Sequence, residues 1–156
     1  MRILCDTREQ VCLTFELDNF LTGIDRVKLD AGDYQALYAD GTKSKTVFER
    51  KGSLSDLFGT LGRSYKRFRK ELDRARTSGV RLVLIIQATY SEVLEGFERS
   101  QLEGISIVRK LMTLEHRYGL RTVYCSSAKE MSHYIKHYFI AEANERLRDA
   151  NKPSDS

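Results

Sequence analysis

The sequence contains no tryptophan, one proline and three cysteines among its 156 residues. The proline is Pro153, near the C-terminus, so no proline interrupts the chain before it. The cysteines are Cys5, Cys12 and Cys125. Because their number is odd and no C-x-x-C pair occurs, neither a disulfide framework nor a zinc ribbon is indicated. We therefore expect three reduced thiols, with Cys5 in the core among apolar neighbours.

Long apolar runs and glycine-rich phosphate loops are also missing. No run approaches the ~18 apolar residues that cross a bilayer. Acidic residues interrupt the N-terminal stretch MRILCDTREQ, where a signal peptide would stay apolar. Gly59 and Gly62 fall within a predicted helix and not between a strand and a helix, which argues against a nucleotide-binding loop. We therefore expect a cytoplasmic or nucleoid-associated protein with no membrane partner and no nucleotide cofactor.

The composition is that of a basic protein with enough apolar residues for a sizeable core. Hydrophobic residues make up 41% of the chain and charged residues 31%, and the formal net charge is +4. The positive excess favours anionic partners such as nucleic acid. The length suits one domain. Because no internal linker is visible, we predict a single domain over residues 1–150, followed by a disordered polar tail over residues 151–156.

Strand and helix patterns alternate along the chain. The segment VRLVLIIQA is almost continuously apolar, which predicts a strand covered on both faces. The order of the patterns predicts an α/β fold, with a mixed central β-sheet flanked by helices on both faces. The predicted strands span residues 2–6, 25–29, 33–39, 45–50, 80–88 and 121–125. The predicted helices span a short part of 11–23, and then 53–78, 91–97, 102–118 and 128–149.

Three consecutive charges end the predicted strand in the stretch VFERKGSLSD. Strand alternation places Glu49 and Lys51 on one face and Arg50 on the other. A hairpin at Asp40-Gly41 would bring Asp33 close to Glu49. Two acids and a lysine in this arrangement suit metal-assisted phosphodiester cleavage, because carboxylates hold Mg²⁺ and the lysine acts on water or phosphate. The alternative is a solvated, charged hairpin end.

Three blocks of the sequence resemble the XPF/Hef family of structure-specific DNA nucleases, within the PD-(D/E)XK superfamily. They are CDTRE from Cys5, LDAGDY from Leu29 and FERKGSLSD from Phe48, in the order that the family has them. The chain is similar to the short stand-alone members of bacteria and their phages. The resemblance implies a restriction-endonuclease-like fold, with the helical second half agreeing in pattern only.

The resemblance also implies roles for individual residues. Asp33 and Glu49 would ligate Mg²⁺, which Mn²⁺ would replace, with the backbone carbonyl of Arg50 as a third ligand. Lys51 would act on the attacking water or on the phosphate, and Asp6 would lie beside this cluster without ligating the metal directly. These five residues form the predicted catalytic set.

The sequence departs from the family pattern in two places. Four residues separate Lys51 from Asp56, where the family usually has three. The pair Gly62-Arg63 arrives about two residues early. In the first block, Arg8 and Glu9 are expected either to brace the strand ends as an ion pair or to contact DNA.

Basic residues recur along the predicted helix over 53–78, on the side opposite its apolar residues. Phosphate groups of DNA would bind such a face without base specificity, whereas the alternative is a solvated helix face. With Arg8, we predict that four of these residues contact nucleic acid, and that Arg74 lies farther from the site. The four are Arg63, Lys66, Arg67 and Lys70.

Apolar stripes on the last two long helices predict a symmetric homodimer, because aromatic residues are enriched at interfaces. The alternative is that both stripes belong to the core. The stripes comprise Ile105, Val108, Leu111, Met112 and Tyr118, and then Met131, Tyr134, Ile135, Tyr138, Phe139 and Ala143.

The predicted function is a metal-dependent DNA endonuclease that prefers branched, flapped or forked DNA in repair or recombination. One alternative is a non-catalytic DNA-binding or scaffold partner of a nuclease. Another is a different PD-(D/E)XK nuclease, such as a restriction or junction-resolving enzyme.

Overall fold

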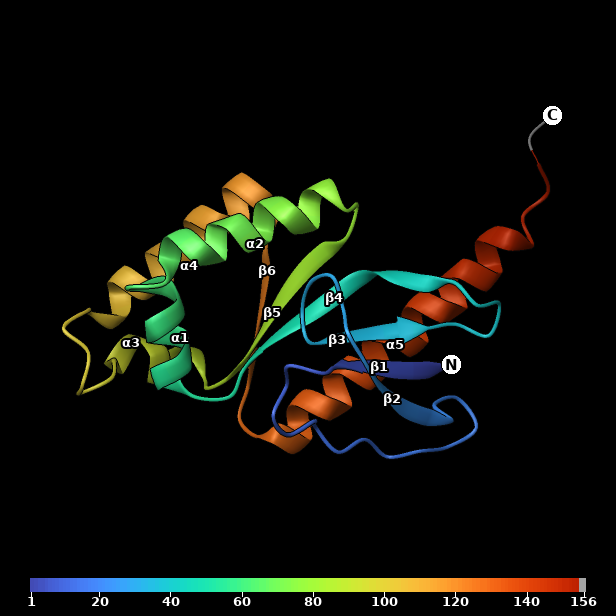
Figure 1. Cartoon of the computed structure of the whole chain (residues 1–156), viewed down its shortest axis with the longest axis horizontal. Coiled ribbons are helices and arrows are strands. Elements are labelled where there is room, and N and C mark those ends of the chain that lie inside the picture. The colour runs from blue at the N-terminus through green and yellow to red at the C-terminus, as the bar shows by residue number, and fades with distance from the viewer. Residues whose placement is uncertain (155–156) are drawn as a thin grey trace.

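Six strands form one mixed sheet within residues 1–154, the part of the chain that the computed structural model describes (Figure 1). The strand order is β2-β1-β3-β4-β5-β6; β3 is antiparallel to both neighbours, and the other adjacent pairs are parallel. The predicted α/β fold is therefore confirmed. The strands are β1 (Arg2–Asp6), β2 (Gly23–Val27), β3 (Tyr34–Leu37), β4 (Lys43–Lys51), β5 (Arg81–Gln87) and β6 (Arg121–Cys125).

Helices cover both faces of the sheet, as predicted. α1, α2 and α4 pack on one face, and α5 runs along the other (Figure 1). Among the described residues, no helix combines the length and apolarity that crossing a membrane requires. The helices are α1 (Leu54–Leu61), α2 (Tyr65–Thr77), α3 (Tyr90–Glu95), α4 (Gly104–Tyr118) and α5 (Ala128–Ala150). Of the predicted disordered tail, residues 155–156 lie outside the described part.

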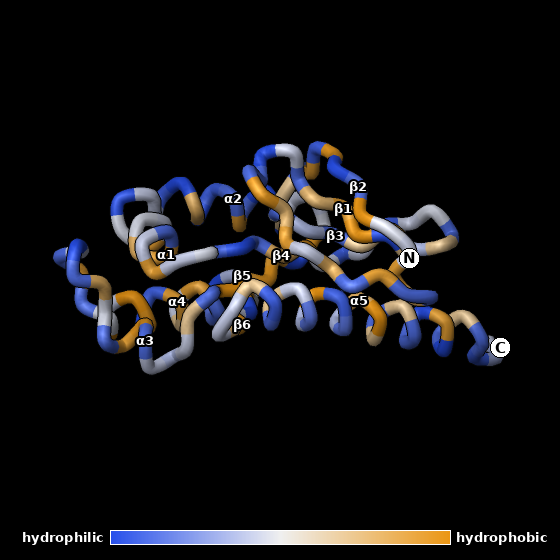
Figure 2. Tube along the Cα trace, turned by 90° about the horizontal axis from the view of Figure 1, so that it is seen from below, coloured by the Kyte–Doolittle hydropathy of each residue, from blue (hydrophilic) through white to orange (hydrophobic). Residues whose placement is uncertain are grey.

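Strand β5 is the centre of the core. Leu82, Leu84 and Ile86 pack toward α1, α2 and α4, while Val83 and Ile85 pack toward α5. All of these side chains are buried, which confirms the predicted strand with two covered faces. Figure 2 shows apolar segments along β5 between α2 and α5. The core therefore consists of two apolar layers, one on each face of the sheet.

The predicted hairpin joins β3 and β4. Tyr38 N donates to Thr42 O over 2.9 Å, and Gly41 adopts a φ of 83°, a conformation that glycine tolerates without steric cost. The register pairs Tyr34 with Phe48. Asp33 therefore lies beside the end of β4, as the sequence predicted.

The prediction of one long helix over residues 53–78 is wrong, because the chain breaks between α1 and α2. Gly62 N donates to Phe58 O over 2.8 Å and closes α1. A Cβ at Gly62 would lie 2.7 Å from Phe58 O and 2.8 Å from Leu102 Cδ1, so only glycine fits this close approach. Arg63 consequently lies in the turn and does not share a helix face with Lys66.

The short helix predicted within residues 11–23 is also absent from the described structure. The segment is extended and follows α5, and Leu13 and Phe15 are buried at alternate positions. Leu13 N donates to Tyr34 Oη over 2.8 Å, and the Phe15 ring packs edge-on against Tyr34 at 5.8 Å. A spacing of two buries side chains on one side of an extended chain, whereas a helix requires three or four.

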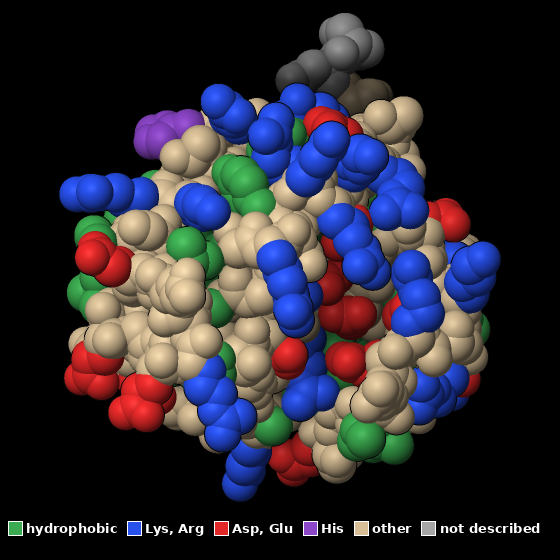
Figure 3. Space-filling view, turned by 60° about the vertical axis from the view of Figure 1, so that its left-hand side comes forward, with side chains coloured by type: hydrophobic (Ala, Val, Ile, Leu, Met, Phe, Trp, Pro, Cys, Tyr) green, Lys and Arg blue, Asp and Glu red, His purple; other side chains and the backbone are tan. Residues whose placement is uncertain are grey.

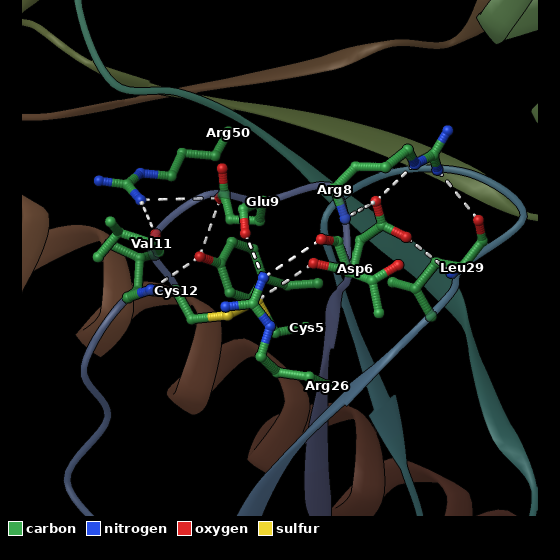
Figure 4. Close-up of a disulfide and its surroundings, with 12 residues drawn as sticks. Cys5, Asp6, Arg8, Glu9, Val11, Cys12, Arg26, Leu29 and Arg50 are labelled. Atoms are coloured by element: carbon green, nitrogen blue, oxygen red, sulfur yellow. Dashed lines mark hydrogen bonds and ion pairs between the residues drawn. A yellow bond between two sulfur atoms is a disulfide. The ribbon is translucent and has the colours of Figure 1, made fainter.

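The expectation of three reduced thiols is wrong for two of them. Cys5 at the end of β1 and Cys12 form a disulfide, with 6.4 Å between their Cα atoms (Figure 4). The chain after β1 turns back on itself, which brings Cys12 within the distance that a disulfide spans. An odd number of cysteines excludes only complete pairing, and Cys125 is the residue left over, buried as a free thiol.

The helices expected to form a dimer interface are largely committed to the core. Tyr134, Tyr138 and Phe139 all pack edge-on around the Phe48 ring of β4, at 5.3 to 6.1 Å between ring centroids. The aromatic residues of α5 are therefore not in excess of what the fold requires. Ile105 and Met112 of α4 do remain exposed. The homodimer stays a prediction, and α4 contributes its exposed apolar residues.

Candidate active site

The end of the β3–β4 hairpin positions the first carboxylate of the site. Asp33 N donates to Phe48 O over 2.7 Å, and Arg50 N donates to Asp33 Oδ2 over 2.8 Å. The preceding Gly32 has a φ of 72°, and a Cβ there would lie 3.0 Å from the Cβ of Val47. Glycine at this position lets the chain turn tightly and place the Asp33 carboxylate against the backbone of β4.

Glu49 and Lys51 supply the second carboxylate and the cation. Both side chains leave β4 on the face covered by α2, and they are only 14% and 16% exposed. Lys51 Nζ donates to Glu49 Oε1 over 3.3 Å. Arg50 leaves β4 on the opposite face, so the predicted alternation along this strand is confirmed.

Burial shifts the protonation of both carboxylates. It raises the pKa of Asp33 to about 8, and repulsion from Glu49 adds to this effect. Burial also raises the pKa of Glu49, although Lys51 opposes the shift. Two carboxylates that share a poorly solvated site do not both ionise easily unless a cation joins them. Such a pair of raised pKa values is a common property of functional sites.

A hollow of about 210 Å³ surrounds the carboxylates, and α2 forms its outer wall. Arg67, Glu71 and Arg74 line this wall at helical spacing, facing Asp33 and Glu49. Figure 3 shows acidic side chains gathered in a hollow, with Lys and Arg side chains around them. The wall combines basic and acidic groups, which is an arrangement suited to holding both phosphate and a cation.

Glu71 is a site residue that the sequence reasoning missed. It also lines a second hollow, of about 200 Å³, together with Glu49, Lys51 and Arg67, and its charge further raises the pKa of Glu49. The spacing from Arg67 to Arg74 would have identified it, because a residue four positions after Arg67 shares the face of both arginines.

Asp6 is bound entirely by protein donors. The residue is 1% exposed, and its carboxylate accepts bonds from Leu29 N at 2.8 Å and from Arg8 N and Nε at 3.1 and 2.6 Å (Figure 4). Burial by itself would raise the pKa of Asp6, but these bonds outweigh it and lower the pKa. Asp6 therefore stabilises the chain at the end of β1, beside the carboxylate pair.

The expected ion pair between Arg8 and Glu9 does not form. Arg8 pairs with Asp6 and donates to Leu29 O over 3.1 Å. Glu9 instead accepts from Tyr34 Oη over 3.0 Å and lies 3.7 Å from Arg50 Nη1 (Figure 4). The turn after β1 separates the two side chains. Arg8 lines the hollow around the carboxylates, whereas Glu9 faces Tyr34 and Arg50.

The remaining predicted DNA contacts lie outside the hollow. Arg63, Lys66 and Lys70 are exposed, the first in the turn and the others on the solvent side of α2. Arg74, which we expected to be farther from the site, lines the hollow with Arg67. Asp56 is exposed in the first turn of α1 and does not line the hollow.

The residues present fit a magnesium ion better than a metal with a full protein cage. No group of three or more His, Cys, Asp or Glu residues in the described part of the chain is close enough to hold an ion. Mg²⁺ usually retains several waters and binds through one or two carboxylates. Asp33 and Glu49 provide that number, and the Arg50 carbonyl stays a predicted third ligand. The chemistry of this donor set therefore suits Mg²⁺ or Mn²⁺.

Comparisons with known proteins identify the family and the fold of this chain. The model of the ERCC4 domain family matches residues 5–138, which include all three sequence blocks. XPF from Aeropyrum pernix has a similar fold, with a TM-score of 0.63 and 18% identity over 94% of this chain and 69% of that one. The same protein in a complex with DNA gives a TM-score of 0.60 and 18% identity over 99% and 68%. The comparison with curated proteins gave no match.

The family match covers the greater part of the chain, and the structural matches have the same mixed sheet between helical layers. The resemblance drawn from the three sequence blocks is thereby confirmed. The chain belongs to the ERCC4 domain family and has the fold of an XPF-type nuclease domain.

Proposed function

We propose that this protein is a metal-dependent DNA endonuclease that hydrolyses phosphodiester bonds. The observation that carries the proposal is the group of Asp33, Glu49 and Lys51 in one hollow, with arginines on its wall. A purely structural site would not keep two poorly solvated carboxylates beside each other, because each disfavours ionisation of the other.

Each side chain has a role that its position supports. Asp33 and Glu49 bind Mg²⁺, and the Arg50 amide fixes the orientation of the Asp33 carboxylate. The bound ion supplies polarisation of the phosphate and a more acidic water. Lys51, held beside Glu49, donates hydrogen bonds to the attacking water or to the phosphate oxygens. Arg67 and Arg74 bind the phosphates on either side of the scissile bond.

The proposal extends to branched DNA as the preferred substrate, in repair or recombination. The site lies at the end of the central strand β4, and α2 forms only one side of its hollow. Such an open hollow admits a strand that bends away from a duplex more readily than a straight duplex. The XPF structure solved with DNA supports DNA as the class of substrate.

The experiment compares linear, flapped, forked and four-way DNAs, each with Mg²⁺, Mn²⁺, Ca²⁺ or EDTA. We expect cleavage with Mg²⁺ and Mn²⁺, fastest on flapped or forked DNA. Glu49→Gln should reduce the rate by about 100-fold or more while leaving the fold intact, because it removes a ligand charge. Asp73→Asn on the exposed side of α2 is the matched control. Cleavage by Glu49→Gln at the wild-type rate would contradict the proposed site. DNA binding without cleavage would favour a scaffold function instead.

A further inference from the structure

A second, larger cavity lies on the other face of the sheet, between the extended segment 11–16 and α5. Its volume is about 620 Å³, within the range of roughly 300–1,000 Å³ that ligand pockets have. We call it the α5 pocket, and its lining includes Val11, Phe15, Arg50, Lys129, His133 and His137. None of the catalytic carboxylates contributes to it.

One wall of the α5 pocket carries basic and imidazole groups in a row. Lys129, His133 and His137 are exposed and follow one another at four-residue spacing, so they share a face of α5. The two imidazole rings lie 4.3 Å apart. No hydrogen bond or ion pair holds the Lys129 ammonium within residues 1–154. This row can donate several hydrogen bonds to an anion outside the helix.

The charged residues beside the row of Lys129, His133 and His137 already pair with other groups. Lys136 is buried, and its ammonium donates to Glu16 O over 2.8 Å and to Asp18 Oδ2 over 2.6 Å. Lys136 therefore holds the segment 11–16 against α5. Glu16 is the one acidic residue lining the pocket. Because Lys136 pairs with Asp18 and Arg50 with Glu9, Lys129 and the two imidazoles are the donors that remain for a ligand.

The opposite wall is apolar. Val11 is 75% exposed, although valine is usually buried, and Phe15 is buried with its ring against Tyr34. An apolar wall facing a row of hydrogen-bond donors suits a ligand that is flat and apolar on one side and anionic on the other. A nucleotide has this composition.

Arg50 connects the α5 pocket to the proposed active site. Its amide donates to the Asp33 carboxylate, while its side chain passes to the other face of β4 and lines the pocket. There its Nη1 donates to Val11 O over 3.1 Å, and its Nε is buried with no partner among the described residues (Figure 4). Arg50 therefore contacts both sites, Asp33 through its backbone amide and the α5 pocket through its side chain.

We propose that the α5 pocket binds one unpaired nucleotide of the single-stranded DNA that enters the proposed active site, on the opposite face of the sheet from the carboxylates. The base lies against Val11 and the segment 11–16, and the phosphates accept hydrogen bonds from Lys129, His133 and His137. The nucleotide is unpaired because a paired base would bring its partner strand against α5. The proposal rests on the proposed nuclease function and explains how that site would select a branched strand.

The test measures binding in EDTA, where no cleavage occurs. The probes are a fluorescein-labelled deoxythymidine octamer and a blunt duplex, titrated by anisotropy at several salt concentrations. In Lys129→Ala/His133→Ala, the affinity for the octamer should fall about tenfold, and the slope of log affinity against log salt should become shallower by roughly 0.7 for each lost phosphate contact. The affinity for the duplex should change little.

A matched control removes the same classes of side chain from the other face of the sheet. Arg109→Ala/His116→Ala alters exposed residues of α4, and it should bind the octamer as the wild type does. Val11→Asp tests the apolar wall. It should lower the affinity for the octamer but not the affinity for an octamer with abasic positions. Circular dichroism melts of all three variants verify folding, which is expected because the replaced side chains are exposed.

Three outcomes would overturn the proposal. They are a wild type that does not bind the octamer, a Lys129→Ala/His133→Ala variant that binds it unchanged, and a polyglutamate peptide that competes with the octamer equally well. The last would indicate an acidic protein partner. Failure of the proposed nuclease function is recognised separately. In that case no DNA is cleaved with Mg²⁺, whether or not the protein binds the octamer.

Discussion

Asp33 combines a well-defined hydrogen bond with an unfavourable position for a charge. Burial raises its pKa to about 8, far above the ordinary value of about 4. The folded protein therefore holds a proton that the unfolded chain releases. Stability without metal consequently falls as the pH rises from about 4 through about 8. The buried Asp33 carboxylate therefore lowers the stability of the metal-free protein at neutral pH, but it can bind a cation there.

Asp33→Asn should therefore stabilise the metal-free protein while abolishing cleavage. We expect its melting temperature in EDTA to exceed that of the wild type by about 3 °C near pH 9, with the difference disappearing near pH 4. Thermal melts across this range measure it. Asp73→Asn, which replaces an exposed acid, should show no such trend. A difference that does not grow with pH would contradict the inferred ionisation.

Glu71 offers a second test at the level of single residues. Its charge faces Glu49 from α2, so it increases the attraction of the site for a cation. Glu71→Gln should raise the Mn²⁺ concentration for half-maximal cleavage by about tenfold, as changes beside metal ligands usually do. A Mn²⁺ titration of cleavage measures this. An unchanged half-maximal concentration would show that Glu71 has only a structural role.

At the scale of elements, the break between α1 and α2 directs Arg67 and Arg74 toward the carboxylates. Gly62 makes the break possible, because a Cβ there would overlap Phe58 O and Leu102. Gly62→Ala should lower the free energy of unfolding by about 2 kcal/mol. Gly59→Ala is the control, since Gly59 lies within α1 with open space around it, and it should stabilise by about 0.5–1 kcal/mol. Urea unfolding distinguishes them; equal effects would refute this account.

The segment after β1 is a second element with a testable constraint. The Cys5–Cys12 disulfide closes a loop with a sequence separation of 7, for which chain entropy predicts a contribution of about 2 kcal/mol. Cys12→Ala should lower the free energy of unfolding by this amount. Dithiothreitol should have the same effect on the wild type and none on the variant. If the reductant destabilises both equally, the disulfide does not stabilise the loop.

At the scale of the whole molecule, the exposed Ile105 and Met112 on α4 favour association of two chains. We expect light scattering at micromolar concentration to give twice the 18.0 kDa mass of the chain. Ile105→Asp/Met112→Asp should give the monomer, because charges are costly at a packed interface. Leu147→Asp, at another exposed apolar residue, is the control. A wild-type monomer would disprove the dimer.

Much of the fold and the central pair of carboxylates could be predicted from the sequence. The alternation of Glu49, Arg50 and Lys51, the Asp40-Gly41 hairpin and the apolar strand β5 all depend on residues close together in the chain. Local backbone geometry determines such features, so the sequence contains the information in a short window. Asp33 was placed near Glu49 for the same reason, because a hairpin joins neighbouring segments.

Other features depended on segments that meet only in the folded molecule. The break at Gly62 reflects contact with Leu102, and the disulfide requires the turn that brings Cys12 back to β1. Glu71 enters the site because α2 packs across the end of β4. Arg8 pairs with Asp6 and not with Glu9 because the turn after β1 directs its side chain toward Asp6. Spacing along the sequence does not specify these partners, because the packing of distant elements determines which side chains come within reach.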